Sequence, residues 1–209
     1  MKVVAINGSP KGNGNTALAL KTVGEELQAQ GIEFEVLQVG GKTMRGCVGC
    51  GGCAKNQDQK CVFGDDVVNE YIQIMKEADG ILLGSPVYYA DMSGTMKCFL
   101  DRVFYVSGAN GNLFRHKVGA SVAAVRRAGG VPALDQLNKY ILYAEMIMPG
   151  STYWNMLYGR VPGDGNHDGE GLQTMRSLGQ NMAWIMKLID KGRAEAPAKL
   201  DKVSTSFVR

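Results

Sequence analysis

Short apolar runs alternate with longer segments of helical periodicity along most of the chain. The apolar runs are rich in Val, Ile, Leu and Ala, which is typical of buried strands. The predicted strands are residues 2–7, 32–39, 80–84, 118–125 and 146–148. The predicted helices are residues 17–27, 67–78, 96–104, 131–145 and 170–191. This alternation predicts an α/β fold, a doubly wound five-stranded parallel sheet of order 2-1-3-4-5 with helices on both faces.

Two long segments without periodicity interrupt the pattern. Residues 40–63 hold four of the five cysteines, and residues 151–168 contain an apolar run around Trp154 to Tyr158. Loops this long inside a compact domain are usually functional. We predict one domain over residues 1–192 with a cysteine-rich insertion at 40–63, followed by a tail at 193–209. The apolar run predicts that either a second subunit or the protein's own core covers it.

The first strand leads into the loop GSPKGNGNT at residues 8–16, directly before a helix. Backbone N–H groups at such a turn point toward an anion, and the positive end of the helix dipole lies behind them. No acidic residue lies within the loop. We interpret it as a phosphate site, with an ordinary glycine-rich turn as the alternative.

The kind of phosphate follows from the surrounding residues. The Gly-Lys-Ser/Thr triplet of a nucleoside triphosphate loop is absent. Gly12 and Gly14 match dinucleotide spacing, but the second strand ends in Gln38 rather than in the acid that holds a ribose. This combination favours a monophosphate such as that of FMN.

Two further loops follow strands at the same predicted edge of the sheet. SPVYYADMS spans residues 85–93, and RRAGG spans residues 126–130. Ligands of doubly wound sheets bind beyond the carboxyl ends of such strands. The tyrosines can offer a flat surface to a flavin ring, with core packing as the alternative. Arg126 or Arg127 can place a positive charge near the ring, with a solvated pair as the alternative.

The spacing C-x-x-C-x-x-C at Cys47, Cys50 and Cys53, followed by Cys61, is compact. Iron–sulfur ligands are spaced in this way because each thiolate must reach a different iron of one cubane. Zinc sites usually separate two C-x-x-C pairs by a dozen or more residues. A [4Fe-4S] cluster, bare thiols and zinc are the three interpretations, and we take Cys98, among Met96, Phe99 and Leu100, as a core residue.

Composition narrows the class of protein. The net charge of +3 is too small to argue for nucleic acid, and no apolar run is long enough to cross a membrane. The N-terminus enters a strand at once, so we expect no signal peptide and a cytoplasmic protein with reduced thiols.

Several motifs together resemble one known family. They are Gly8-Ser-Pro10 with Gly14-Asn-Thr16, Ser85-Pro-Val-Tyr-Tyr89, Met96-Lys97 and Asp101-Arg102. In this combination the chain resembles the NADPH-dependent FMN reductases, which have the flavodoxin-like fold. The cysteine spacing narrows the resemblance to the iron-sulfur flavoproteins within that family, over roughly residues 2–190.

The resemblance implies a set of cofactor contacts. The phosphate loop would contribute Ser9, Pro10, Gly14, Asn15 and Thr16. The flavin ring would be flanked by Pro86, Val87, Tyr88 and Tyr89 on one side and by Arg127, Ala128, Gly129 and Gly130 on the other. The metal ligands would be Cys47, Cys50, Cys53 and Cys61. No catalytic residue is predicted.

Three functions remain open from the sequence. The first is a redox protein that couples two-electron chemistry of FMN to one-electron transfer through a [4Fe-4S] cluster. The second is an NAD(P)H-dependent flavin or quinone reductase without a cluster. The third is a flavodoxin-type carrier, against which the slightly basic charge argues. We expect NAD(P)H or reduced ferredoxin as donor, a small molecule or protein as acceptor, and a homodimer or homotetramer.

Overall fold

The computed structural model describes residues 1–201, 203–205 and 207. Its centre is a parallel sheet of five strands in the order β2-β1-β3-β4-β5, as predicted. The strands are β1 (Lys2–Asn7), β2 (Glu33–Gln38), β3 (Gly80–Pro86), β4 (Val118–Val125) and β5 (Met156–Tyr158). Every residue of β4 is buried, which explains its continuous apolar run, because a central parallel strand is covered on both faces.

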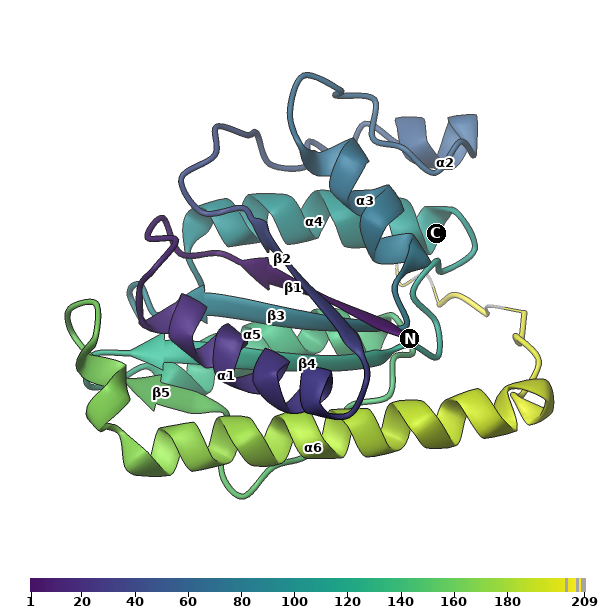
Figure 1. Ribbon diagram of the computed structural model, residues 1–209. Coiled ribbons are helices and arrows are strands. Elements are labelled where there is room, and N and C mark those ends of the chain that lie inside the picture. The colour runs from purple at the N-terminus through teal and green to yellow at the C-terminus, as the bar shows by residue number, and fades with distance from the viewer. Residues whose placement is uncertain (202, 206, 208–209) are drawn as a thin grey trace.

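Among the described residues, five α-helices pack on the two faces of this sheet, and a short sixth helix, α2, lies over α4 (Figure 1). They are α1 (Asn15–Ala29), α2 (Gly52–Asn56), α3 (Val68–Glu77), α4 (Gly94–Ala109), α5 (Gly130–Tyr143) and α6 (Gly169–Gly192). Helices α1 and α6 cover one face, where they pack on alternate residues such as Val3, Ala5 and Leu82. Helices α3, α4 and α5 cover the other face, against Val4, Ile6 and Ile81. The period-two alternation along β1 therefore supplies both cores.

The fifth strand was predicted in the wrong place. Residues 146–148 make a single isolated bridge, between Ile147 and Val118 at the amino end of β4. Strand β5 instead pairs Met156 to Tyr158 with Ala123 to Val125, farther along β4. Leu157 is fully buried and Met156 nearly so, so the protein's own core covers this part of the apolar run. Trp154 and Tyr158, at the two ends of the run, stay about half-exposed, so the core covers the middle of the run alone.

Helix α2 was not predicted either. It lies within the cysteine-rich insertion, starts after Gly51 at φ 70° and ends at Gln57 at φ 54°. Five residues between two left-handed positions carry too little periodicity to be recognised in a sequence. None of the helices that the structure describes is long and apolar enough to cross a membrane.

Candidate functional site

Buried hydrogen bonds join the loops after β1 and β3 at the carboxyl edge of the sheet. The Gly8 amide donates to the carbonyl of Gly84 at 2.7 Å. Ser93 caps the N-terminus of α4, and its hydroxyl also donates to the Gly8 carbonyl at 2.7 Å. The Ser93 amide in turn donates to Ser85 Oγ at 2.9 Å. These bonds hold the start of the first loop, residues 8–16 after β1, against the N-terminus of α4.

The first loop turns sharply at Ser9, which is buried. Its amide donates to Asn7 Oδ1 at 3.0 Å, and its hydroxyl accepts from the Lys11 amide at 3.2 Å. Gly40 lies directly against this turn, because a Cβ there would be 2.1 Å from the Ser9 carbonyl carbon. Lys11 itself is exposed at the mouth of the loop, where it adds a cation that the sequence interpretation overlooked.

Gln38, at the end of β2, braces the same turn. It accepts from Asn7 Nδ2 at 2.9 Å and donates to the carbonyls of Ser9 at 2.6 Å and Gly40 at 2.7 Å. Both polar atoms of its side chain are therefore engaged, Oε1 with the Asn7 side chain and Nε2 with two backbone carbonyls of the loops. This position, which carries the ribose-binding acid of dinucleotide folds, serves here as a structural support.

Helix α1 begins two residues earlier than predicted, so Asn15 and Thr16 lie in its first turn. That turn holds no acidic residue, and Thr16 is buried. The Asn15 side chain donates to the Val161 carbonyl at 3.0 Å and accepts from the Gly165 amide at 3.2 Å. It thereby joins the first loop to the segment after β5, and its backbone amide remains the group placed for an anion.

The loop after β3 forms a tight turn. Tyr88 and Asp91 exchange backbone hydrogen bonds of 2.9 and 3.0 Å across Tyr89 and Ala90. Tyr89 and Ala90 have φ of 51° and 61°, a conformation that costs a residue with a side chain about 1–2 kcal/mol. The Tyr89 ring is fully exposed and the Tyr88 ring half-exposed. Strain that presents an aromatic ring to solvent is typical of ligand-binding loops.

The loop after β4 packs on this turn. Gly129 has φ 84°, and a Cβ there would be 2.8 Å from Ala90 Cα. A Cβ on Gly130 would be 2.1 Å from Met156 Sδ. The preceding residues 126–128 are exposed. The three loops predicted to contact a flavin therefore meet at one edge, with Asn15, Arg127 and the tyrosines from three different connections.

The four predicted metal ligands line the wall of one small cavity. They are Cys47, Cys50, Cys53 and Cys61. The α4 side of this cavity is formed by Arg102, Tyr105 and Val106. Cys47 and Cys50 are exposed, Cys61 is half-buried, and Cys53 is buried. Burial raises the pKa of the Cys53 thiol. Among the described residues, no three His, Cys, Asp or Glu side chains are arranged to hold a metal ion. A shared cavity wall nevertheless suits a polynuclear cluster, whose irons each take one thiolate.

Close packing brings the two arms of the cysteine loop together. A Cβ on Gly52 would be 2.3 Å from Val62 Cγ1, so the start of α2 lies against the residue after Cys61. Asn110, which ends α4, donates to the Cys53 carbonyl at 3.3 Å and accepts from the Gln59 amide at 2.9 Å. The loop is thus attached along α4 rather than to the sheet.

The cysteines lie away from the edge that the three loops form. Figure 1 shows α2 over the end of α4 that is remote from the β1–α1 connection. Val106, beside the cavity, is twelve residues beyond Gly94 at the N-terminus of α4, which corresponds to about 18 Å along a helix. The cysteine loop follows β2, whose carboxyl end lies at the same rim as the first loop, and on topology alone cluster and flavin would share that rim; the structure does not place them together there. The insertion leaves that rim at Gly40 and then follows α4.

The residues of α4 that belong to the family motifs point in three directions: toward the first loop, toward α5 and toward the cysteine loop. Met96 packs under the first loop, with its Cβ 2.9 Å from a Cβ placed on Gly8. Lys97 pairs with Asp101 at 2.6 Å, and Asp101 also accepts from the Tyr140 hydroxyl. Burial and then this hydrogen bond raise the pKa of Tyr140 to about 12.

The cysteine side of α4 carries two more residues of interest. Arg102 is buried and points into the cysteine loop. Cys98 is half-buried rather than part of the core, and its sulfur lies 3.5 Å from a Cβ placed on Gly46.

Comparison with known proteins decides the family. The model of the NADPH-dependent FMN reductase family matches residues 1–159. The chain belongs to this family. Its curated relatives include an iron-sulfur flavoprotein of Methanocaldococcus jannaschii, 38% identical over 198 residues that cover 91% of this chain and 100% of the relative. An iron-sulfur flavoprotein of Archaeoglobus fulgidus is 30% identical over 88% of this chain and 79% of its own length. The resemblance seen in the sequence motifs is confirmed.

Solved structures confirm the flavodoxin-like fold of this FMN reductase family member. RosB with bound 8-demethyl-8-formylriboflavin-5′-phosphate superimposes with a TM-score of 0.74 at 12% identity, covering 100% of this chain and 92% of RosB. An archaeal flavodoxin gives 0.59 at 19% identity, covering 90% and 99%.

Three supporting residues were missed in the sequence. Gln38, Asn69 and Arg102 each hold a loop through several hydrogen bonds. Gln38 was noticed only as the absence of an acid, and Arg102 only as part of a family motif. Arg102 meets partners 36 to 57 positions away, and Gln38 reaches Asn7 and Ser9 at 31 and 29 positions, so local spacing carries no signal for these contacts. The partners of Asn69 are only six and eight positions away, but no motif singles them out.

Proposed function

We propose that this protein is an FMN-dependent oxidoreductase that couples two-electron flavin chemistry to one-electron transfer through a [4Fe-4S] cluster. The observation that carries the proposal is the shared cavity of Cys47, Cys50, Cys53 and Cys61 in a chain of the FMN reductase family. Curated relatives named iron-sulfur flavoproteins support it. A cytoplasmic setting, in which thiols stay reduced, agrees with five free cysteines.

The first loop and the start of α1 would bind the phosphate of FMN. Ser9, Gly14, Asn15 and Thr16 would surround it with a hydroxyl and with amides of the first helical turn, and Pro10 would shape the turn. Lys11 would add a positive charge from the exposed side. The bracing of Gln38 leaves no acid for a second ribose, which supports FMN over FAD.

The two other loops would hold the flavin ring. Pro86 to Tyr89 would offer one flank, with exposed rings ready to stack, and Arg127 to Gly130 would offer the other. The bound flavin would supply the exchange between two-electron and one-electron chemistry. Arg126 and Arg127, both exposed at this edge, would stabilise negative charge near the ring.

The separation along α4 favours electron transfer between subunits. Within one chain the α4 residues that line the cysteine cavity, Arg102 to Val106, lie about 12–18 Å along the helix from its N-terminus at Gly94, beside the loops that would hold FMN. A neighbouring subunit in a homodimer or homotetramer can bring the two centres closer. Large side chains exposed around β5 and α6 offer a surface for this contact; they include Tyr153, Trp154 and Trp184. A monomer in light scattering at micromolar concentration would contradict the assembly.

A cluster-free NAD(P)H-dependent flavin reductase is the second candidate, because the family model is named for that activity. Protein purified without oxygen separates the two. The proposal expects iron, sulfide and FMN together, with one-electron acceptors reduced faster than in protein from which the iron has been removed. Stoichiometric FMN without iron would leave the plain reductase.

The donor is a separate question with its own assay. NADPH, NADH and reduced ferredoxin are offered in turn to the FMN-loaded protein, with a small-molecule or protein acceptor. Turnover with one of them identifies the donor. Reduction without turnover by any of them would favour a flavodoxin-type carrier instead.

A further inference from the structure

Arg102 lies inside the protein, beneath the cysteine loop. Its side chain is fully buried, although arginine is almost never buried without a partner. It projects from the middle of α4, on the side that closes the cysteine cavity. A buried guanidinium has to satisfy its charge and its N–H groups within the protein.

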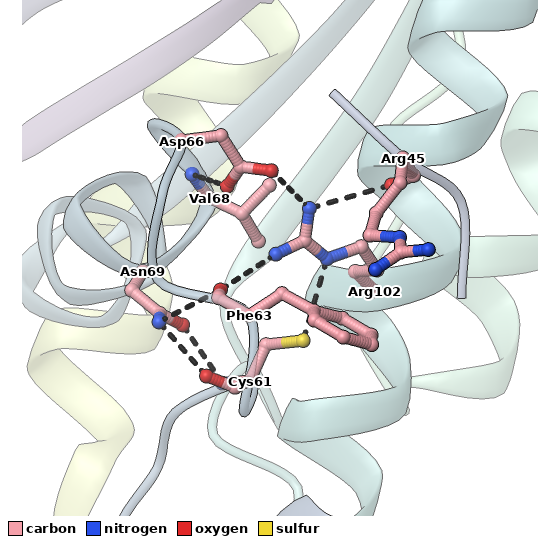
Figure 2. Close-up of polar contacts among 7 residues, drawn as sticks. All are labelled: Arg45, Cys61, Phe63, Asp66, Val68, Asn69 and Arg102. Atoms are coloured by element: carbon pink, nitrogen blue, oxygen red, sulfur yellow. Dashed lines mark hydrogen bonds and ion pairs between the residues drawn. The ribbon is translucent and has the colours of Figure 1, made fainter. Parts of the chain in front are cut away.

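Figure 2 shows that Arg102 reaches both arms of the loop. It forms an ion pair with Asp66, which is also buried, and donates to the Phe63 carbonyl at 2.8 Å. On the other arm it donates to the Arg45 carbonyl at 3.3 Å. Its Nε donates to Cys61 Sγ, also at 3.3 Å. The guanidinium therefore holds the chain before Cys47 and the chain around Cys61 in one place.

A second side chain fixes the backbone of Cys61. Asn69, in the first turn of α3, accepts from the Cys61 amide at 2.7 Å and donates to its carbonyl at 2.9 Å. The backbone is thus bound to α3 and the sulfur to α4. Arg102 thus supplies a side-chain donor to the sulfur of a predicted cluster ligand.

We propose that Arg102 positions Cys61 as the fourth cluster ligand and raises the reduction potential of the cluster. This inference rests on the proposed function. A hydrogen bond to a ligand sulfur, together with a nearby positive charge, stabilises the reduced cluster because reduction adds one negative charge. Asp66 opposes this effect with its carboxylate but keeps the guanidinium in place.

The two members of the ion pair therefore have opposite effects on the potential. Arg102→Gln removes the donor to Cys61 and leaves the Asp66 carboxylate unpaired, so the midpoint potential falls. Asp66→Asn removes a negative charge, so the potential rises. A purely structural role predicts something else, because both substitutions damage the same buried pair and would shift the potential in the same direction or not at all.

The experiment is a redox titration of the cluster signal in electron paramagnetic resonance, on protein made without oxygen. Wild type, Arg102→Gln, Asp66→Asn and Arg102→Lys are compared, with Arg193→Gln as a control because Arg193 forms exposed ion pairs. We expect a lower potential in Arg102→Gln, a higher one in Asp66→Asn and no shift in Arg193→Gln. Arg102→Lys keeps the positive charge, so its midpoint potential should lie between those of Arg102→Gln and wild type.

Two outcomes overturn the inference, and they are distinguishable. Equal potentials in iron-loaded wild type and Arg102→Gln, or shifts of the same sign in Arg102→Gln and Asp66→Asn, remove the role of Arg102 alone. Wild-type protein with FMN but no iron removes the proposed function as well. Should Arg102→Gln fail to fold, the shifts of the midpoint potential in the other two variants decide the question: a rise in Asp66→Asn with a small fall in Arg102→Lys supports the inference, and no rise in Asp66→Asn overturns it.

Discussion

The loops at the carboxyl edge of the sheet are shaped by close glycine contacts and by side chains of that same edge, such as Gln38 and Ser93, whereas the cysteine loop is held by side chains that reach it from α3 and α4. At the edge, Gly40 lies against Ser9 and Gly129 against Ala90, each too close for a Cβ. In the cysteine loop, Asn69 and Arg102 provide several hydrogen bonds each.

Because the two regions are held by different contacts, a substitution can disturb one of them and leave the other intact. The strands that precede the edge loops are paired along their length and hold these loops in place. A Cβ added at one of their close-packed glycines therefore displaces the site. The cysteine loop depends on a few polar side chains at the far half of α4, so their loss affects ligand placement and leaves the sheet intact. The predictions below test this separation.

Gly40→Ala is expected to have the largest effect, and on the edge site alone. Its Cβ would lie 2.1 Å from backbone atoms of Ser9, so the loop has to move. We expect a loss of about 3 kcal/mol in the free energy of unfolding and loss of bound FMN. Urea unfolding and flavin content measure both. Gly12→Ala is the control, because the nearest atom to its Cβ is 3.8 Å away; equal losses in both variants would refute the packing argument.

Asn69→Ala is expected to affect the cysteine loop alone. It removes the hydrogen bonds to the Cys61 amide and carbonyl, at a cost of about 2 kcal/mol. Iron content should fall while FMN content stays at the wild-type level. Asn181→Ala, which loses one exposed bond to the Gly150 carbonyl, is the control. A parallel loss of FMN in Asn69→Ala would show that the two sites are not independent.

Thr16→Ala should weaken FMN binding by about 1–3 kcal/mol if its hydroxyl binds the phosphate. Fluorescence titration of iron-loaded protein measures the dissociation constant. Thr22→Ala is a matched control on the same helix, because the Thr22 hydroxyl donates to the Leu18 carbonyl. Unchanged FMN affinity in Thr16→Ala would remove this residue from the phosphate site.

Tyr89→Gly is expected to have the smallest effect on stability and to sharpen the role of the strained turn. Glycine tolerates φ 51° without the penalty of a side chain, so the unfolding free energy should rise by about 0.5 kcal/mol. FMN affinity should fall nevertheless, because the exposed ring is lost. A variant that is more stable and binds FMN as tightly as wild type would show that the ring does not contact the flavin.

The sheet and the edge loops could be predicted because their signals are local. The apolar run at residues 118–125 agrees with β4 to the residue, since a strand buried on both faces has no competing pattern. Gly129 and Gly130 were placed correctly at the end of that strand. Strand β5 was misplaced because two apolar runs compete for β4, and the sequence does not show that Ile147 reaches only its amino end.

The sequence indicated which cysteines gather at one site, but not where in the fold that site lies. The spacing of Cys47, Cys50 and Cys53 indicated a cluster, and all line one cavity with Cys61. The insertion's course along α4 depends on Arg102 and Asn110, which are distant in sequence. Oligomeric state, donor, and the boundary between domain and tail stay predictions.

The most direct test of the central claim is the iron content of Cys53→Ala beside that of Cys98→Ala, in protein made without oxygen. Cys53 is buried in the wall of the cysteine cavity, whereas Cys98 lies on α4 outside it. We predict about four irons per subunit in wild type and in Cys98→Ala, near-complete loss of iron in Cys53→Ala, and equal FMN in all three. Equal iron in the two variants, or no iron in the wild type, would contradict the claim.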